Sequence, residues 1–205
     1  MPPKPVTVIF IGRSGSGKGT QAKLLMDALA SKDVARSVFY VETGAKFREF
    51  FTSANDERVY SRELASKITA AGGLQPEFLT VWTWADLLLN GIRGNEHLVF
   101  DGTPRKIHEA QVLNSAVEFY GWQNPLVIHL DVDHTVAADR LVTRGRYDDQ
   151  PEIIQKRMGW FETDVMPILD YYRGNPRYHV FDIDGGQGIE AVHQDIMKAL
   201  ARNTL

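Results

Sequence analysis

The 205-residue sequence contains no cysteine. This absence excludes disulfides and thiolate metal sites, and it fits a protein from a reducing compartment. The sequence also lacks an apolar run of about 18 residues, the length that a membrane span needs. Its first residues, Met1-Pro2-Pro3-Lys4-Pro5, have no apolar targeting centre. We therefore expect a cytoplasmic protein without a membrane partner.

A strong excess of charge of either sign is missing as well. The formal net charge is −3, which gives no support for binding nucleic acid through its phosphates. Hydrophobic residues make up 43% of the chain and charged residues 24%, as in ordinary globular proteins. The length suits a single domain with a small insertion. We expect a monomer with no nucleic-acid partner.

The most informative segment lies near the beginning of the chain. A β-branched and aromatic run leads into Gly12-Arg13-Ser14-Gly15-Ser16-Gly17-Lys18-Gly19-Thr20, and helix formers follow. In this order of strand, glycine loop and helix N-terminus, backbone N–H groups and the helix dipole surround phosphates, while a lysine adds a full charge. The segment therefore predicts a nucleotide-binding site.

Strand-like runs alternate with helical stretches along the whole chain. We expect strands at 6–11, 38–42, 97–101, 126–131 and 178–183, and helices at 18–31, 104–120, 134–143, 151–172 and 189–201. Alternation of this kind, with continuously apolar strands, implies an α/β fold in which helices cover both faces of a five-stranded parallel sheet. Ligands then bind beyond the carboxyl ends of the strands.

One connection is much longer than a crossover requires. The segment from Thr43 to Glu96 shows no strand signal, and a simple crossover needs far fewer residues. Part of this segment is therefore expected to be a helical insertion with its own task. We place the insertion at about 43–75, and the core of the single domain at 1–42 and 76–205.

Charged residues gather just beyond the expected strand ends. Arg48 follows Thr43-Gly44, and Arg105 ends the motif Asp101-Gly102-Thr103-Pro104-Arg105. Along the helix and turn after the fourth strand lie Arg140, Arg144, Arg146 and Arg157, with Asp148 and Asp149 among them, where we expect the acidic pair to orient the arginines. Converging arginines suggest more phosphate than one nucleotide carries. For any single arginine, a solvated ion pair on a helix face is the alternative.

Taken together and in this order, the motifs resemble those of the adenylate kinase family of nucleoside monophosphate kinases. The resemblance implies a P-loop kinase fold. It also implies reversible transfer of the γ-phosphoryl group of ATP to a nucleoside monophosphate, with Mg²⁺ as cofactor. AMP is the expected acceptor.

The resemblance also implies roles for individual residues. ATP contacts are expected from Gly15, Ser16, Gly17, Lys18, Gly19, Thr20, Arg140, Arg144 and Gln187. Acceptor contacts are expected from Thr43, Arg48, Gly73, Leu74, Gln75, Gly102, Thr103, Pro104, Arg105, Glu109, Arg146 and Arg157. The expected catalytic residues are Lys18, Arg105, Arg144, Arg146 and Arg157, and Asp101 is expected to orient Mg²⁺ through water.

The sequence departs from a reference pattern in two places near the phosphates. Gly19 follows Lys18 where a standard P-loop has Ser or Thr, a difference that the family shares, with Thr20 one place later. Direct ligation of Mg²⁺ by a loop hydroxyl is therefore less expected than in a standard P-loop. Only Gly145 separates Arg144 from Arg146 where most members carry a lid, so the lid is reduced to about 144–150 and leaves no room for a structural zinc. We expect either leakage of ATP to water or cover by another chain.

A third departure concerns the acceptor base. Glu109 stands where adenylate kinases carry a glutamine against that base. An ionised carboxylate only accepts hydrogen bonds, which suits the N1–H and N2 amine of guanine better than adenine. GMP or another monophosphate is therefore the alternative acceptor, and a Glu109 that points to solvent is a further possibility. A non-catalytic nucleotide-binding switch is the alternative of another class.

Overall fold

A computed structural model describes residues 4–53, 57–146 and 149–203. Its parallel sheet has the order β2-β3-β1-β4-β5. The strands are β1 (Thr7–Ile11), β2 (Val38–Glu42), β3 (His97–Asp101), β4 (Leu126–Asp131) and β5 (His179–Asp184). The expected five-stranded parallel sheet is confirmed, and each expected strand agrees with the structure to within one residue at either end.

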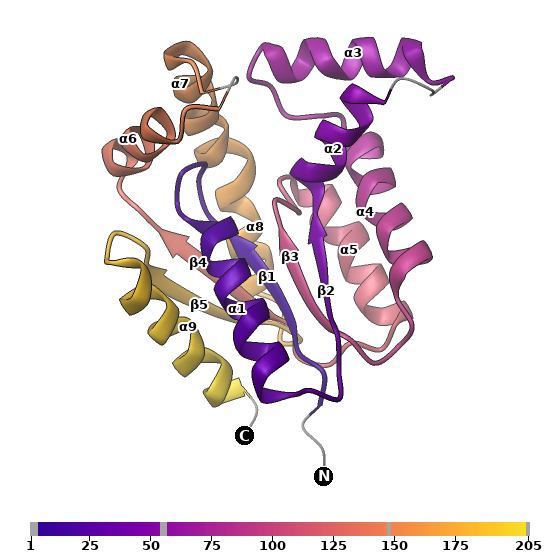
Figure 1. The fold of residues 1–205 in the computed structure, drawn as a ribbon, viewed down its shortest axis with the longest axis vertical. Coiled ribbons are helices and arrows are strands. Elements are labelled where there is room, and N and C mark those ends of the chain that lie inside the picture. Colours follow the sequence, from indigo (N-terminus) through magenta and orange to yellow (C-terminus); the bar gives the residue numbers. More distant parts are fainter. Residues whose placement is uncertain (1–3, 54–56, 147–148, 204–205) are drawn as a thin grey trace.

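Helices cover both faces of the sheet, as Figure 1 shows. Helices α1 (Lys18–Lys32) and α9 (Ile189–Asn203) pack on one face, and α4 (Glu77–Gly91), α5 (Ile107–Phe119) and α8 (Met166–Arg173) pack on the other. Side chains of β1 alternate between the two cores: Val8 and Phe10 meet α1 and α9, whereas Ile9 and Ile11 meet α4, α5 and α8. Burial on both faces explains why the strands are continuously apolar.

Two helical arms extend beyond the carboxyl ends of the strands (Figure 1). The first consists of α2 (Thr43–Thr52), which continues directly from β2, and α3 (Val59–Ala70). A small apolar cluster of Phe50, Ala65 and Leu79 packs this arm against α4. The second arm consists of α6 (His134–Arg144) and α7 (Pro151–Trp160). Among the described residues, no helix is both long and apolar enough to cross a membrane.

Two expected helices differ from the structure. Helix α5 begins at Ile107, three residues later than expected, because the backbone of Lys106 is extended. The carboxylate of Glu109 in the first turn of the helix accepts a hydrogen bond from the Arg105 backbone N–H and fixes this start. The expected helix at 151–172 is α7, a π-helical turn η1 (Phe161–Val165) and α8 in succession. Pro167 has no N–H for the regular helical bond at this junction.

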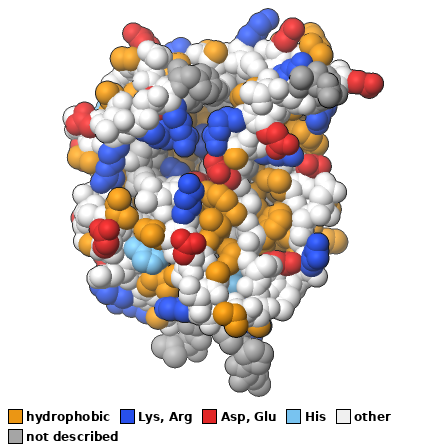
Figure 2. Space-filling model, viewed as in Figure 1, with side chains coloured by type: hydrophobic (Ala, Val, Ile, Leu, Met, Phe, Trp, Pro, Cys, Tyr) orange, Lys and Arg blue, Asp and Glu red, His pale blue; other side chains and the backbone are white. Residues whose placement is uncertain are grey.

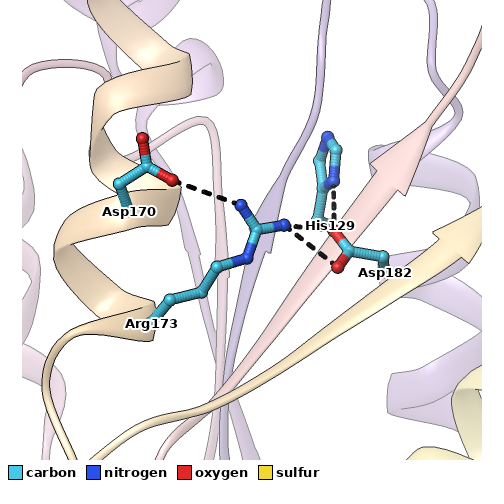
Figure 3. Close-up of polar contacts among 4 residues, drawn as sticks. All are labelled: His129, Asp170, Arg173 and Asp182. Carbon is cyan, nitrogen blue, oxygen red and sulfur yellow. Dashed lines mark hydrogen bonds and ion pairs between the residues drawn. The ribbon is translucent and has the colours of Figure 1, made fainter.

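A polar cluster beside this turn joins β4, β5 and α8 (Figure 3). The Nδ1 atom of His129 lies 2.8 Å from Asp182, and Arg173 donates to both oxygens of the same carboxylate at 2.8 and 3.0 Å. The His129 ring also packs on Phe161 of η1. Burial favours a higher pKa for Asp182, but the hydrogen bonds from His129 and Arg173 outweigh it and lower the pKa.

We expect Asp182→Asn to lower the free energy of unfolding at pH 7 by up to about 1 kcal/mol, since Asp182 is partly exposed. A carboxylate with a lowered pKa stabilises the fold above its ordinary value of 3.8, and this contribution is lost as the pH falls through the folded-state pKa. The difference between variant and parent should therefore shrink below pH 4. Urea unfolding of variant and parent at pH 7 and below pH 4 measures this difference in stability.

The matched control is Asp170→Asn, which removes a more exposed carboxylate that meets the same Arg173 at 3.4 Å. A loss as small as that of the control, or a difference that persists in acid, contradicts the prediction.

Candidate active site

A cleft of about 750 Å³ lies beyond the carboxyl ends of the strands and is lined by residues of both arms. Figure 2 shows blue Lys and Arg side chains gathered around this hollow in the upper half of the molecule. The expected site residues that line it are Gly15, Ser16, Gly17, Lys18, Gly19, Thr20, Thr43, Arg48, Gly73, Leu74, Gln75, Asp101, Gly102, Arg105, Glu109, Arg140, Arg144, Arg146, Arg157 and Gln187. The structure therefore brings residues from distant parts of the sequence to one place.

Two expected site residues do not line the cleft. Thr103 and Pro104 are buried beneath the turn that follows β3. The Thr103 hydroxyl donates a hydrogen bond to Glu109. The two residues line a small separate hollow together with Lys18 and Arg105, and their contacts with an acceptor stay a prediction.

The phosphate loop connects β1 to α1, and close packing explains its glycines. Gly15 has φ +85°, and a Cβ there would lie 2.2 Å from the carbonyl oxygen of Ala137 in α6. Only glycine, which has no Cβ, adopts this positive φ without strain and avoids a clash with the Ala137 carbonyl. A Cβ at Gly19 would lie 3.3 Å from an oxygen of Asp101. The glycine that interrupts the usual Lys-Ser/Thr pattern therefore leaves room for this carboxylate.

Lys18 folds back over its own loop. Its Nζ atom donates to the carbonyl oxygens of Gly12 at 2.6 Å and Arg13 at 2.9 Å. Burial lowers the pKa of Lys18 to about 8, while nearby Asp101 opposes this shift and Arg105 and Arg144 add to it. The ammonium group can exchange its carbonyl partners for phosphate oxygens without leaving the loop.

Asp101 ends β3 and faces the phosphate loop. One of its oxygens accepts a hydrogen bond of 3.0 Å from the Tyr40 hydroxyl, a residue of β2 that the sequence motifs did not identify. Burial and the neighbouring Asp101 raise the pKa of Tyr40, so it remains a donor. Among the described residues, no group of three or more His, Cys, Asp or Glu side chains could hold a metal alone. Mg²⁺ takes one or two carboxylates together with water and substrate phosphates, and Asp101 fits this mode.

Asp149 holds the arginines of the second arm. Its carboxylate is fully buried and accepts from Arg144 at 2.9 and 2.7 Å, from the Arg146 backbone N–H at 3.0 Å and from Arg157 at 3.3 Å. Burial favours a higher pKa for Asp149, but these hydrogen bonds and charges lower it. The expectation that an acidic residue orients these arginines is confirmed for Asp149, whereas Asp148 lies outside the described residues.

The two ends of the cleft carry further arginines. Arg140 donates to the Gly185 carbonyl at 2.8 Å, close to the exposed Gln187. At the other end, Arg48 of α2 pairs with Glu42 at 2.8 Å. Each guanidinium is held by one partner and keeps further N–H groups for a ligand.

Glu109 is almost fully buried, with 2% of its surface exposed. One carboxylate oxygen accepts from the Thr103 hydroxyl, and the other accepts from the Arg105 backbone N–H at 2.7 Å. Burial raises the pKa of Glu109. The possibility that Glu109 points to solvent is therefore wrong. Its two oxygens hold the turn that carries Arg105.

Trp160, the last residue of α7, is a cleft residue that the sequence motifs did not identify. Its indole N–H donates to the Gly72 carbonyl at 3.2 Å, and the Arg105 guanidinium lies 5.5 Å from its ring centroid. Its one signal in the sequence is a position three residues after Arg157, one helical turn away.

A phosphate loop between β1 and α1, in a parallel sheet with arginines on both sides of the cleft, defines a P-loop phosphotransferase. The adenylate kinase family model matches residues 10–176, and the chain therefore belongs to the adenylate kinase family. It is an enzyme of the nucleoside monophosphate kinase type.

Named relatives agree with this assignment. The chain is 30% identical to adenylate kinase 1 of a Nostoc species over 193 residues, which cover 94% of this chain and 97% of the relative. It is 31% identical to the adenylate kinase of Leuconostoc mesenteroides, with 94% and 96% covered, and 28% identical to that of Corynebacterium urealyticum, with 94% and 98% covered.

The lowered pKa of Lys18 predicts a pH dependence of ATP use. The charged form binds phosphate and predominates below pH 8, so kcat/KM for ATP should fall above pH 8 by about tenfold per pH unit. Steady-state kinetics from pH 6.5 to 9.5 measure this decline. In Lys18→Arg, which stays charged throughout, the rate should be lower but the decline absent. If kcat/KM still declines above pH 8 in Lys18→Arg, a group other than Lys18 causes the decline.

The Asp149 contacts predict a combined loss of activity and stability. In Asp149→Asn the arginines lose their shared carboxylate, so kcat should fall more than about tenfold because the groups that align phosphate are no longer held. The free energy of unfolding should fall by about 2 kcal/mol. Kinetics and urea unfolding measure the two effects. Asp139→Asn, an exposed residue of α6, is the control, and equal effects of both variants contradict the prediction.

Proposed function

We propose that the enzyme transfers the γ-phosphoryl group of ATP reversibly to AMP, with Mg²⁺ and as a monomer. The observation that supports this most directly is the cleft lined by Lys18 and by arginines from both arms. The named relatives are adenylate kinases, which supports AMP as the acceptor.

The cleft suits two phosphate-bearing ligands that meet head to head. In the donor half, the N–H groups of the phosphate loop, Lys18, Arg140 and Arg144 hold the phosphates of ATP, with Gln187 near its base. In the acceptor half, Arg48, Arg105 and Arg157 hold the monophosphate, and Arg146 approaches the group in transfer. Thr43, Gly73, Leu74, Gln75 and Gly102 line the space for the acceptor base.

The chemistry requires alignment and charge neutralisation more than covalent help. An oxygen of the acceptor monophosphate is already anionic, so it attacks the γ-phosphorus without a general base while the bond to the β-phosphate oxygen breaks. Arginines that are already fixed by carboxylates and carbonyls stabilise the equatorial oxygens with little reorganisation. Asp101 would hold Mg²⁺ through water, and the bound metal would supply positive charge to the phosphates during transfer.

The alternative acceptor and the alternative class receive less support. Recognition of guanine would need a carboxylate directed at the base, whereas the two oxygens of Glu109 accept from Thr103 and Arg105 at the turn before α5. A switch without catalysis does not need acceptor-side arginines, yet Arg48, Arg105 and Arg157 all line the cleft. The reduced lid remains compatible with a small leak of ATP to water.

A coupled assay with ATP, Mg²⁺ and each monophosphate tests the proposal. We expect AMP to give the highest kcat/KM, GMP to give less than about one hundredth of it, and ATP hydrolysis without an acceptor to be slow but measurable. A higher rate with GMP overturns the acceptor, and hydrolysis without any transfer supports the switch instead.

Glu109→Gln is the companion variant in this assay. An amide presents an N–H₂ group to one of the two donors that Glu109 now satisfies, so kcat/KM for AMP should fall about tenfold with AMP still preferred over GMP. Glu118→Gln, a half-exposed carboxylate on the same helix, is the control. If Glu109→Gln instead changes the preferred acceptor from GMP to AMP, Glu109 contacts the acceptor base and this prediction is wrong.

A further inference from the structure

The two arms of the cleft touch where the end of α3 meets α7 (Figure 1). The Lys156 ammonium group donates to the Ala71 carbonyl at 3.0 Å, and the Trp160 indole donates to the Gly72 carbonyl at 3.2 Å. These are acceptors at the C-terminal end of a helix, where carbonyls have no partner within the helix and carry partial negative charge. Donors from α7 therefore cap α3.

The contact uses one face of α7. Ile153, Lys156 and Trp160 are spaced by three and four residues, so they lie on one side of the helix. Gly72 has φ +74°, and a Cβ there would lie 3.2 Å from the Ile153 side chain. The turn after α3 therefore packs closely against this face of α7.

Trp160 has a second contact, with Arg105. Its ring lies against the Arg105 guanidinium at 5.5 Å, within the range of a cation–π interaction. Arg105 also donates its backbone N–H to Glu109 and its Nε to the Gly102 carbonyl at 2.9 Å. The indole therefore limits where the guanidinium can move within the cleft.

We infer that Trp160 is a positioning residue for the acceptor. Through its N–H it holds the Gly72 turn, and with it the adjoining segment Gly73–Gln75, over the acceptor half of the cleft. Through its ring it fixes the guanidinium of Arg105, which on the proposed function grips the acceptor phosphate. The expected change in kinetics rests on the proposed function, whereas the contact of Trp160 with Gly72 and Arg105 does not.

Two substitutions separate the two contacts. Trp160→Phe keeps a ring under Arg105 and removes the N–H, so the KM for AMP should rise about five- to tenfold with kcat at or above the parent value. Trp160→Leu removes both contacts, so the KM should rise further and kcat should fall as well. The KM for ATP should stay within about twofold in both. An unchanged KM for AMP, or an equal rise for ATP, overturns the inference.

A measurement without nucleotides keeps this test independent of the proposed function. The N–H groups of Gly72 and Gly73 bond to the carbonyls of Thr69 and Ile68 at 2.9 and 3.0 Å. Their amide hydrogens should exchange faster in Trp160→Phe than in the parent, because the turn opens locally more often. Unchanged exchange overturns the inference. Faster exchange in a protein that fails to phosphorylate AMP refutes only the proposed function.

Two further variants complete the experiment. Trp122→Phe removes a tryptophan that stacks on Tyr120 away from the cleft, and it should leave both KM values and the exchange at Gly72 unchanged. Lys156→Met removes the neighbouring bond from an exposed side chain, so the fold is preserved. It should raise the KM for AMP about two- to threefold. No rise in this variant, or a rise in the Trp122 control, counts against the contact between the arms.

Discussion

Repulsion between like charges is the constraint on which this structure depends. Lys18 and the arginines of both arms converge on one cleft, where a low dielectric strengthens their mutual repulsion. Asp149 offsets it for Arg144 and Arg157, Glu42 for Arg48, and Asp101 for Lys18 and Arg105. These carboxylates hold the cations in place until phosphates arrive, so the enzyme does not have to assemble its charge at the moment of reaction.

The sequence predicted the architecture well because each signal for it is local. Apolar runs such as Leu126–Asp131, and the glycine loop before Lys18, identify strands and a phosphate site from neighbouring residues alone. The parallel sheet then dictates that distant strand ends meet at one edge. For this reason nearly all the expected site residues do line the cleft, although their individual roles remain predictions.

The contacts that the sequence did not reveal are those made between separate elements. The side-chain direction of Glu109 depends on Thr103 and on the irregular turn before α5, and no periodicity reports it. Tyr40 reads as an ordinary strand residue until β2 and β3 pair and bring it to Asp101. Trp160 gains its partners only when α7 packs against the turn after α3 and the segment after β3. Packing across elements, unlike strand or helix formation, has no signature within a short window of sequence.

The π-helical turn η1 has a consequence for the whole second arm. An α-helix advances by about 100° per residue, and a π turn accommodates one residue more than a regular turn. The turn thus sets the rotational phase between α7, whose face points into the cleft with Arg157 and Trp160, and α8, whose face packs in the core with Ile168 and Tyr172. Loss of a single residue there would rotate one set of side chains away from its partners. The length of this segment, and not only its composition, is therefore under structural constraint.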